Sequence, residues 1–149
     1  MILIELPEII QYENKSRLQA NINIDGIVKP VWFEVDNKYG EYLCYERSDA
    51  FVIGILNYAM RNGHDIKCVA PLGEELHYQL TNYLIEAVYK SSKTLYKTKI
   101  ISEIDTTIIK SANAVGTGIS CGIDSFYAIS THTSTIYPNH NITHLAFNN

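Results

Sequence analysis

Serine, glycine and aspartate residues meet in one short segment near the end of the chain, residues 120–125, which read SCGIDS. A small, mostly apolar run at 114–119 precedes this segment and an apolar run at 126–129 follows it, a pattern that predicts a strand, a loop and then a helix. Backbone N–H groups at the start of a helix have no intrahelical partner, and the helix dipole adds partial positive charge there. The segment therefore predicts a binding site for an anion such as phosphate.

The side chains of this segment suit a phosphate group that is shared with a metal ion. Gly122 has no side chain to block the approach of an anion, while Ser120 and Ser125 offer hydroxyl donors. Asp124 would repel a bare phosphate, so if it faces the ligand we expect it to hold Mg²⁺ together with the phosphate oxygens. The alternative is that Asp124 is an ordinary acidic residue in the first turn of a helix, where the dipole favours it.

The run SCGIDS resembles the Ser-Gly-Gly-x-Asp-Ser motif of the PP-loop ATP pyrophosphatases, also called adenine nucleotide alpha hydrolases. Cys121 departs from the motif, because it stands where the family has its first glycine. The resemblance implies an enzyme that cleaves ATP between the α and β phosphates, adenylates a substrate oxygen and releases pyrophosphate. ATP and Mg²⁺ are the implied cofactors, and the implied partner is a small-molecule or RNA substrate.

The resemblance also implies a role for each residue of this segment. Asp124 would be both the catalytic residue and the ligand of Mg²⁺. Phe147 and Asn148, at the end of the second strand, would lie near the adenine. The pyrophosphate would be held by the hydroxyls and amides of the loop: Ser120, Cys121, Gly122, Ile123 and Ser125.

The last forty residues are expected to form a βαβ unit with parallel strands, since a second apolar run at 142–147 follows the helix after a break at 138–141. The resemblance covers only about residues 112–149, whereas a whole PP-loop domain is a larger, doubly wound parallel sheet. We therefore interpret 111–149 as the incomplete start of such a domain. The chain is expected to be the N-terminal part of a longer protein.

Residues 1–110 are expected to form an α+β accessory domain, which makes the chain α/β overall. Asp25-Gly26 predicts a hairpin turn, and helical spacing of apolar residues begins after Ser48 and stops at Asn62-Gly63. A second amphipathic helix is expected to follow Pro71-Leu72-Gly73 and to end before Ser91. Further strands are expected within 1–10, 18–24, 31–35, 41–45, 65–69, 98–101 and 107–109.

Composition excludes several classes of protein. A formal charge of −4 without any basic block gives no electrostatic footprint for duplex DNA. Three cysteines with no CxxC pair are typical of free thiols in a reducing compartment, and no apolar run approaches the ~20 residues of a membrane span. We therefore expect a cytoplasmic protein with no membrane partner.

Other residues that could do chemistry also have plainer roles. His132, His140 and His144 lie close in sequence, and the last two would share a face of a helix, but Pro138 and the strand-like run after Asn141 argue against a helix there and so against a metal site. The loose basic stretch at 90–99 is typical of a solvated helix end. The alternative function is a non-catalytic nucleotide-binding or phosphate-binding protein, or an interaction protein, with a degenerate PP-loop. An incomplete sheet also predicts self-association through its unpaired edge.

Overall fold

The computed structural model describes residues 1–108, 114–136 and 141–147. The chain divides into two compact units, Met1–Thr107 and Ile108–Asn149. The first unit combines helices with a sheet that is partly parallel and partly antiparallel, so the expected mixture of α and β structure is confirmed.

A six-stranded sheet forms the centre of the first unit, in the order β2-β3-β1-β5-β7 with β4 paired to β3. β1 runs antiparallel to β3 but parallel to β5, and β5 in turn runs parallel to β7. A short parallel pair, β6 with β8, lies outside this sheet. The strands are β1 (Ile2–Ile4), β2 (Glu8–Gln11), β3 (Lys15–Ile24), β4 (Ile27–Asp36), β5 (Ile66–Cys68), β6 (Leu72–Gly73), β7 (Ile100–Ile101) and β8 (Ile104–Asp105).

The β3–β4 hairpin turns where the sequence predicts it. Asp25 and Gly26 both have positive φ values, 51° and 90°, as the tight turns that join twisted strands require. Asn23 assists this turn, because its side-chain oxygen accepts a hydrogen bond of 2.9 Å from the N–H of Gly26. The hairpin therefore has a fixed register, in which Ile24 lies opposite Ile27.

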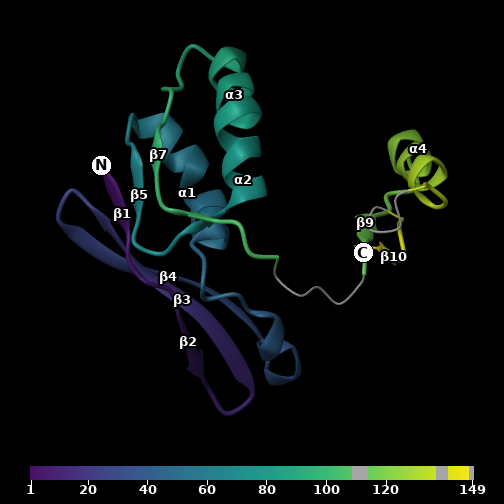
Figure 1. Ribbon diagram of the computed structural model, residues 1–149, viewed down its shortest axis with the longest axis horizontal. Coiled ribbons are helices and arrows are strands. Elements are labelled where there is room, and N and C mark those ends of the chain that lie inside the picture. Colours follow the sequence, from purple (N-terminus) through teal and green to yellow (C-terminus); the bar gives the residue numbers. More distant parts are fainter. Residues whose placement is uncertain (109–113, 137–140, 148–149) are drawn as a thin grey trace. The chain divides into compact units, whose positions relative to one another are not determined.

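Two helical segments complete the first unit. α1 (Asp49–Asn62) ends at Gly63, whose left-handed φ of 67° closes the helix as the Asn-Gly pair predicts. The second segment runs through α2 (Glu74–Gln79), a π-helical turn (Leu80–Leu84) and α3 (Ile85–Ser91). Figure 1 shows this segment as one long rod beside β7.

One face of the sheet carries the core. Residues alternate along β1, β3 and β5, so that Ile4, Ile22 and Ile66 are buried with Phe51 and Met60 of α1. Leu80 and Ile85 of the rod belong to the same cluster, so α1 and the rod cover the same face. The first unit is therefore a two-layer structure in which the other face of the sheet is uncovered.

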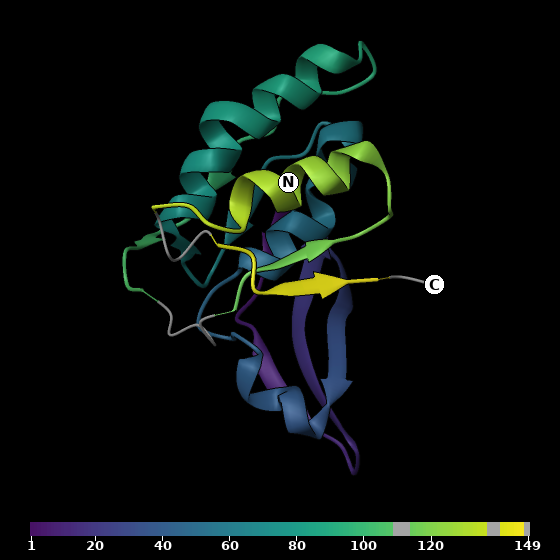
Figure 2. The same ribbon diagram turned by 90° about the vertical axis from the view of Figure 1, so that its right-hand side faces the viewer.

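The second unit is a single βαβ turn. β9 (Gly116–Gly118) leads into α4 (Ile123–His132), and β10 (His144–Ala146) lies parallel to β9. Figure 2 shows the two strands as neighbouring arrows with α4 beside them. The predicted parallel pairing is confirmed, whereas the doubly wound sheet stays a prediction.

Two of the expected strands are wrong, and a third segment is divided into two strands. Residues 1–10 hold two strands, because Pro7 interrupts them between β1 and β2. The segment expected as a strand at 41–45 instead overlaps a 3-10 helix, Asn37–Tyr42, in which Gly40 is packed against Ser16. The strand expected at 107–109 lies earlier, at β8, and Ile109 is outside the described residues.

Candidate functional site

The segment 119–125 joins the end of β9 to the start of α4. The N–H of Ile119 still donates to the carbonyl of Ala146 at 2.8 Å, so the ladder continues to the first residue of the loop. The first bond of the helix runs from the N–H of Phe126 to the carbonyl of Gly122 at 3.2 Å. No side chain caps α4, so the amides of its first turn are open to an external acceptor.

Cys121 adopts the backbone conformation of a glycine. Its φ is 59°, in the left-handed region that costs a residue with a Cβ roughly 1–2 kcal/mol. The loop thus has a left-handed turn at the position where the resembled motif carries glycine. Cys121 itself is exposed, and its thiol lies outside any disulfide.

The two serines of the loop point toward one another. Their hydroxyl oxygens, Oγ of Ser120 and Oγ of Ser125, lie 3.5 Å apart. Ser125 also donates to the carbonyl of Gly122 at 2.9 Å, within its own turn. A Cβ built on Gly122 would lie 3.5 Å from the Ser120 oxygen, an ordinary contact distance, so Gly122 borders the Ser120 hydroxyl.

Asp124 lies in the first turn of α4, as expected, and its side chain is exposed. Among the residues that the structure describes, no group of three or more metal-ligating side chains is found. Mg²⁺ fits such a sparse site only when phosphate oxygens and waters complete its shell, which is its usual mode of binding in phosphate sites. Asp124 is thus a fitting partner for an ion that arrives with its nucleotide.

The carboxyl ends of β9 and β10 lie level with each other. Ala146 is paired with Gly118, so Phe147 leaves the sheet at the same edge as the loop that begins at Ile119. Phe147 is exposed, with an aromatic ring available for stacking on a base. Asn148, predicted to lie beside it near the adenine, is outside the described residues.

The site residues therefore fall into one local arrangement. The structure brings Ser120, Gly122 and Ser125 together, and it places Ile123 and Asp124 in the first helical turn. Chemically, this arrangement offers backbone and hydroxyl donors at the positive end of a helix dipole, which suits an anion with several oxygens.

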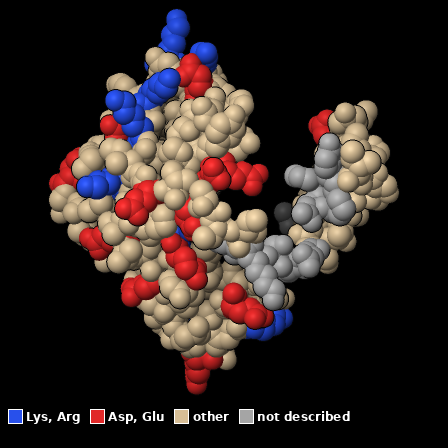
Figure 3. Space-filling view, in the orientation of Figure 1, with Lys and Arg blue, Asp and Glu red and all other residues tan. Residues whose placement is uncertain are grey.

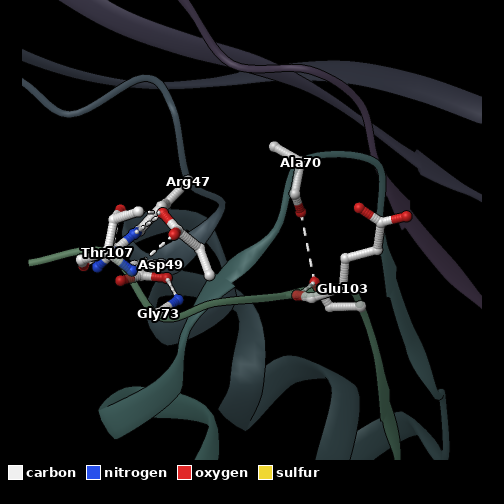
Figure 4. Close-up of polar contacts among 8 residues, drawn as sticks. Arg47, Asp49, Ala70, Gly73, Glu103 and Thr107 are labelled. Carbon is white, nitrogen blue, oxygen red and sulfur yellow. Dashed lines mark hydrogen bonds and ion pairs between the residues drawn. The ribbon is translucent and has the colours of Figure 1, made fainter.

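A polar cluster in the first unit was missed by sequence reasoning (Figure 4). The guanidinium of Arg47 donates to Asp105 at 2.8 Å and to the carbonyl of Thr107, while Asp49 accepts a bond of 2.9 Å from the N–H of Gly73. Hydrogen bonds from the N–H and hydroxyl of Thr107, and then from Arg47, lower the pKa of Asp105 to about 2. These contacts tie the last strand of the unit to the start of α1. Arg47 and Asp105 stand 58 residues apart, so no local pattern could have paired them.

The other candidate residues take plainer roles. Cys68 is a core residue, and burial raises the pKa of its thiol to about 11, which makes it a poor nucleophile. Burial, with contacts to Glu46, also raises the pKa of Cys44. Cys44 lies in the loop after the 3-10 helix, so its expected place in a strand is wrong.

The expected basic stretch lies at the end of α3 and in the loop that follows it, where Figure 3 shows lysine side chains gathered. Lys90 and Lys97 both pair with Glu86, at 3.0 and 2.7 Å, so this one carboxylate offsets one of their two positive charges. His132 and His144 lie on α4 and β10, and His140 is outside the described residues.

Within the described part of the chain, no helix is both long and apolar enough to cross a bilayer. Comparisons with protein-family models, with curated proteins and with solved structures find no match to this chain.

Proposed function

We propose that this chain binds ATP through its 119–125 loop and serves an adenylating reaction of the PP-loop type. The observation that carries the proposal is the uncapped start of α4, which a short loop joins to a parallel strand, together with the hydroxyl oxygens of Ser120 and Ser125, 3.5 Å apart, in that loop and the first helical turn. The left-handed φ of Cys121 supports it further, because the loop has the conformation that the glycine of the motif would favour.

In the proposed reaction, an oxygen of the substrate attacks the α phosphorus of ATP and pyrophosphate leaves. The amides of Ile123 and Asp124 and the hydroxyl of Ser120 would donate to the pyrophosphate oxygens, where negative charge grows as the bond breaks. The hydroxyl of Ser125 would join them by turning away from the carbonyl of Gly122, to which it donates in this structure. Mg²⁺, held by Asp124 and the phosphates, would neutralise part of that charge. Phe147, at the same sheet edge, would stack on the adenine.

A pyrophosphate-release assay with ATP and candidate acceptors, small molecules and RNA alike, tests the reaction. Asp124→Ala should lower release by about a hundredfold or more, the usual cost of removing a charge-stabilising group. Ser130→Ala is the matched control, since its hydroxyl bonds only within α4, to the carbonyl of Tyr127 at 2.9 Å. Unchanged turnover in the Asp124 variant, with an intact fold, would contradict the mechanism.

A second candidate, a non-catalytic binding or interaction protein, is favoured by the exposure of apolar side chains in the second unit. Ile123 is 85% exposed, Tyr127 70% and Leu145 53%. Such surfaces favour association, either with another copy of the chain or with another protein. Sedimentation of the chain over a range of concentrations tests it: reversible self-association supports this candidate, and a monomer at high concentration counts against it.

A further inference from the structure

Lys29 is an exposed charged residue among apolar residues at the turn end of one face of the β3–β4 hairpin. It lies opposite Ile22, between the pairs Ile24 with Ile27 and Ala20 with Val31. Side chains alternate along a strand, so Lys29 shares the face on which Ile22 is buried. No ion pair joins Lys29 to another residue of the described chain, and Asp25, the acid in the hairpin turn, pairs instead with the amino group of Met1 at 3.2 Å.

Beside Lys29 lies a hollow of about 380 Å³, within the ~300–1,000 Å³ range of small-molecule sites. The hairpin and α1 supply its lining, and the hollow is partly open to solvent, since Ile27 of the lining is exposed. Lys29 is the one charged residue of the lining. The residues that line the hollow are Ile22, Ile24, Ile27, Lys29, Val31, Gly54, Ile55 and Tyr58.

Gly54 indicates that the hollow is not a simple packing defect. It stands in the middle of α1, where glycine costs about 1 kcal/mol relative to alanine. Crowding does not explain it, because a Cβ at Gly54 would meet only the ring of Phe33, at an ordinary contact distance of 3.6 Å. The missing side chain therefore leaves space open and lowers the stability of the helix.

We propose that this hollow binds a small apolar molecule that ends in a carboxylate. The apolar part would pack against Ile22, Ile27 and Ile55, and the carboxylate would pair with the ammonium group of Lys29. A single lysine suits a singly charged group, whereas a phosphate monoester carries nearly two charges and needs more donors. The size of the hollow fits a small molecule, since a protein partner would need roughly 800 Å² of surface.

The probe is sodium octanoate, titrated into the full chain with isotope-labelled isoleucine methyl groups. Saturable shifts are expected at Ile22, Ile27 and Ile55 and not at Ile101, which lies outside the lining on β7, an edge strand that β1 and β5 separate from the hairpin. 1-Octanol has the same hydrocarbon tail without the charge. We expect it to bind about tenfold more weakly, because it loses one charge-assisted contact.

Two variants separate the apolar and the charged parts of the site. Lys29→Gln should remove the preference for octanoate over octanol. The control is Lys67→Gln, at an exposed position of β5 outside the lining, which should keep this preference. Gly54→Leu should fill the hollow and weaken both ligands, while Gly54→Ala reports whether α1 tolerates a side chain there. The proposal is overturned if octanoate does not saturate, if Lys29→Gln leaves the preference intact, or if the shifts lie elsewhere. In those outcomes Lys29 serves only to protect an edge strand from pairing.

Discussion

Cys121 shows how one residue can satisfy the geometry of a loop at an energetic cost. Its φ of 59° is the conformation that glycine adopts freely, and a cysteine there carries a Cβ against the backbone. The sequence identified this position as a departure from the motif, but the sign of φ is visible only in the structure. The thiol is exposed, so packing does not explain the choice of residue.

We predict that Cys121→Gly stabilises the second unit. Relief of the left-handed strain, about 1–2 kcal/mol, exceeds the roughly 0.5–1 kcal/mol of chain entropy that glycine adds to the unfolded state. Hydrogen exchange of the α4 amides should report the gain as slower local opening. Cys121→Ala keeps the Cβ and should not stabilise the second unit. An equal effect of both variants would contradict the claim that the left-handed φ strains the backbone at Cys121.

A second prediction at this scale concerns Asp105, whose pKa falls from 3.8 to about 2 in the folded chain. Because the folded pKa lies below the unfolded one, this carboxylate contributes stability that is fully present above about pH 5 and is lost as the pH falls toward 2. Urea unfolding at several pH values across this window should show that the free energy of unfolding falls more steeply with decreasing pH in the natural chain than in Asp105→Asn. Equal slopes would contradict a folded-state contact with Thr107 and Arg47.

At the scale of elements, the local patterns were informative where one or two residues determine the backbone. Asp25-Gly26 and Asn62-Gly63 predicted a hairpin and a helix end, and both occur with positive φ. The expected strand at 41–45 failed because tertiary packing of Gly40 against Ser16 determines that segment. The Arg47–Asp105 pair was beyond prediction because it joins distant segments of the chain.

Gly63→Ala tests the end of α1. The left-handed φ of 67° disfavours any Cβ, and the added carbon would also lie 3.3 Å from the ring of Tyr96. We expect a loss of about 1–2 kcal/mol or slightly more in the free energy of unfolding. Gly26→Ala is the matched control, since it shares the positive φ but has open space around it. A smaller loss at Gly63 than at Gly26 would contradict the contact with Tyr96.

At the scale of the whole molecule, the two units differ in what they bury. All the fully buried apolar residues of the described chain lie in Met1–Thr107, whereas β9, α4 and β10 contain none. A unit with its own core is expected to fold alone, and a single βαβ turn is not. The first unit is therefore the stable part of this chain, and the second needs a covering surface.

We predict that residues 1–107 expressed alone unfold cooperatively, with a melting temperature within a few degrees of the full chain. Residues 1–101 form the matched control, because this shorter piece lacks Asp105 and Thr107, the partners of Arg47. It should melt at a lower temperature. If residues 1–107 are unfolded by circular dichroism, the second unit contributes to the core of the first.

The most direct test of nucleotide binding is a titration of the isotope-labelled chain with Mg²⁺ and ATP, followed at each backbone amide. We predict that the largest shifts lie at Cys121 to Ser125, and that Ser125→Ala weakens binding while Ser130→Ala does not. Shifts confined to the lysine-rich end of α3, or none in the presence of saturating nucleotide, would contradict an ATP site at the start of α4.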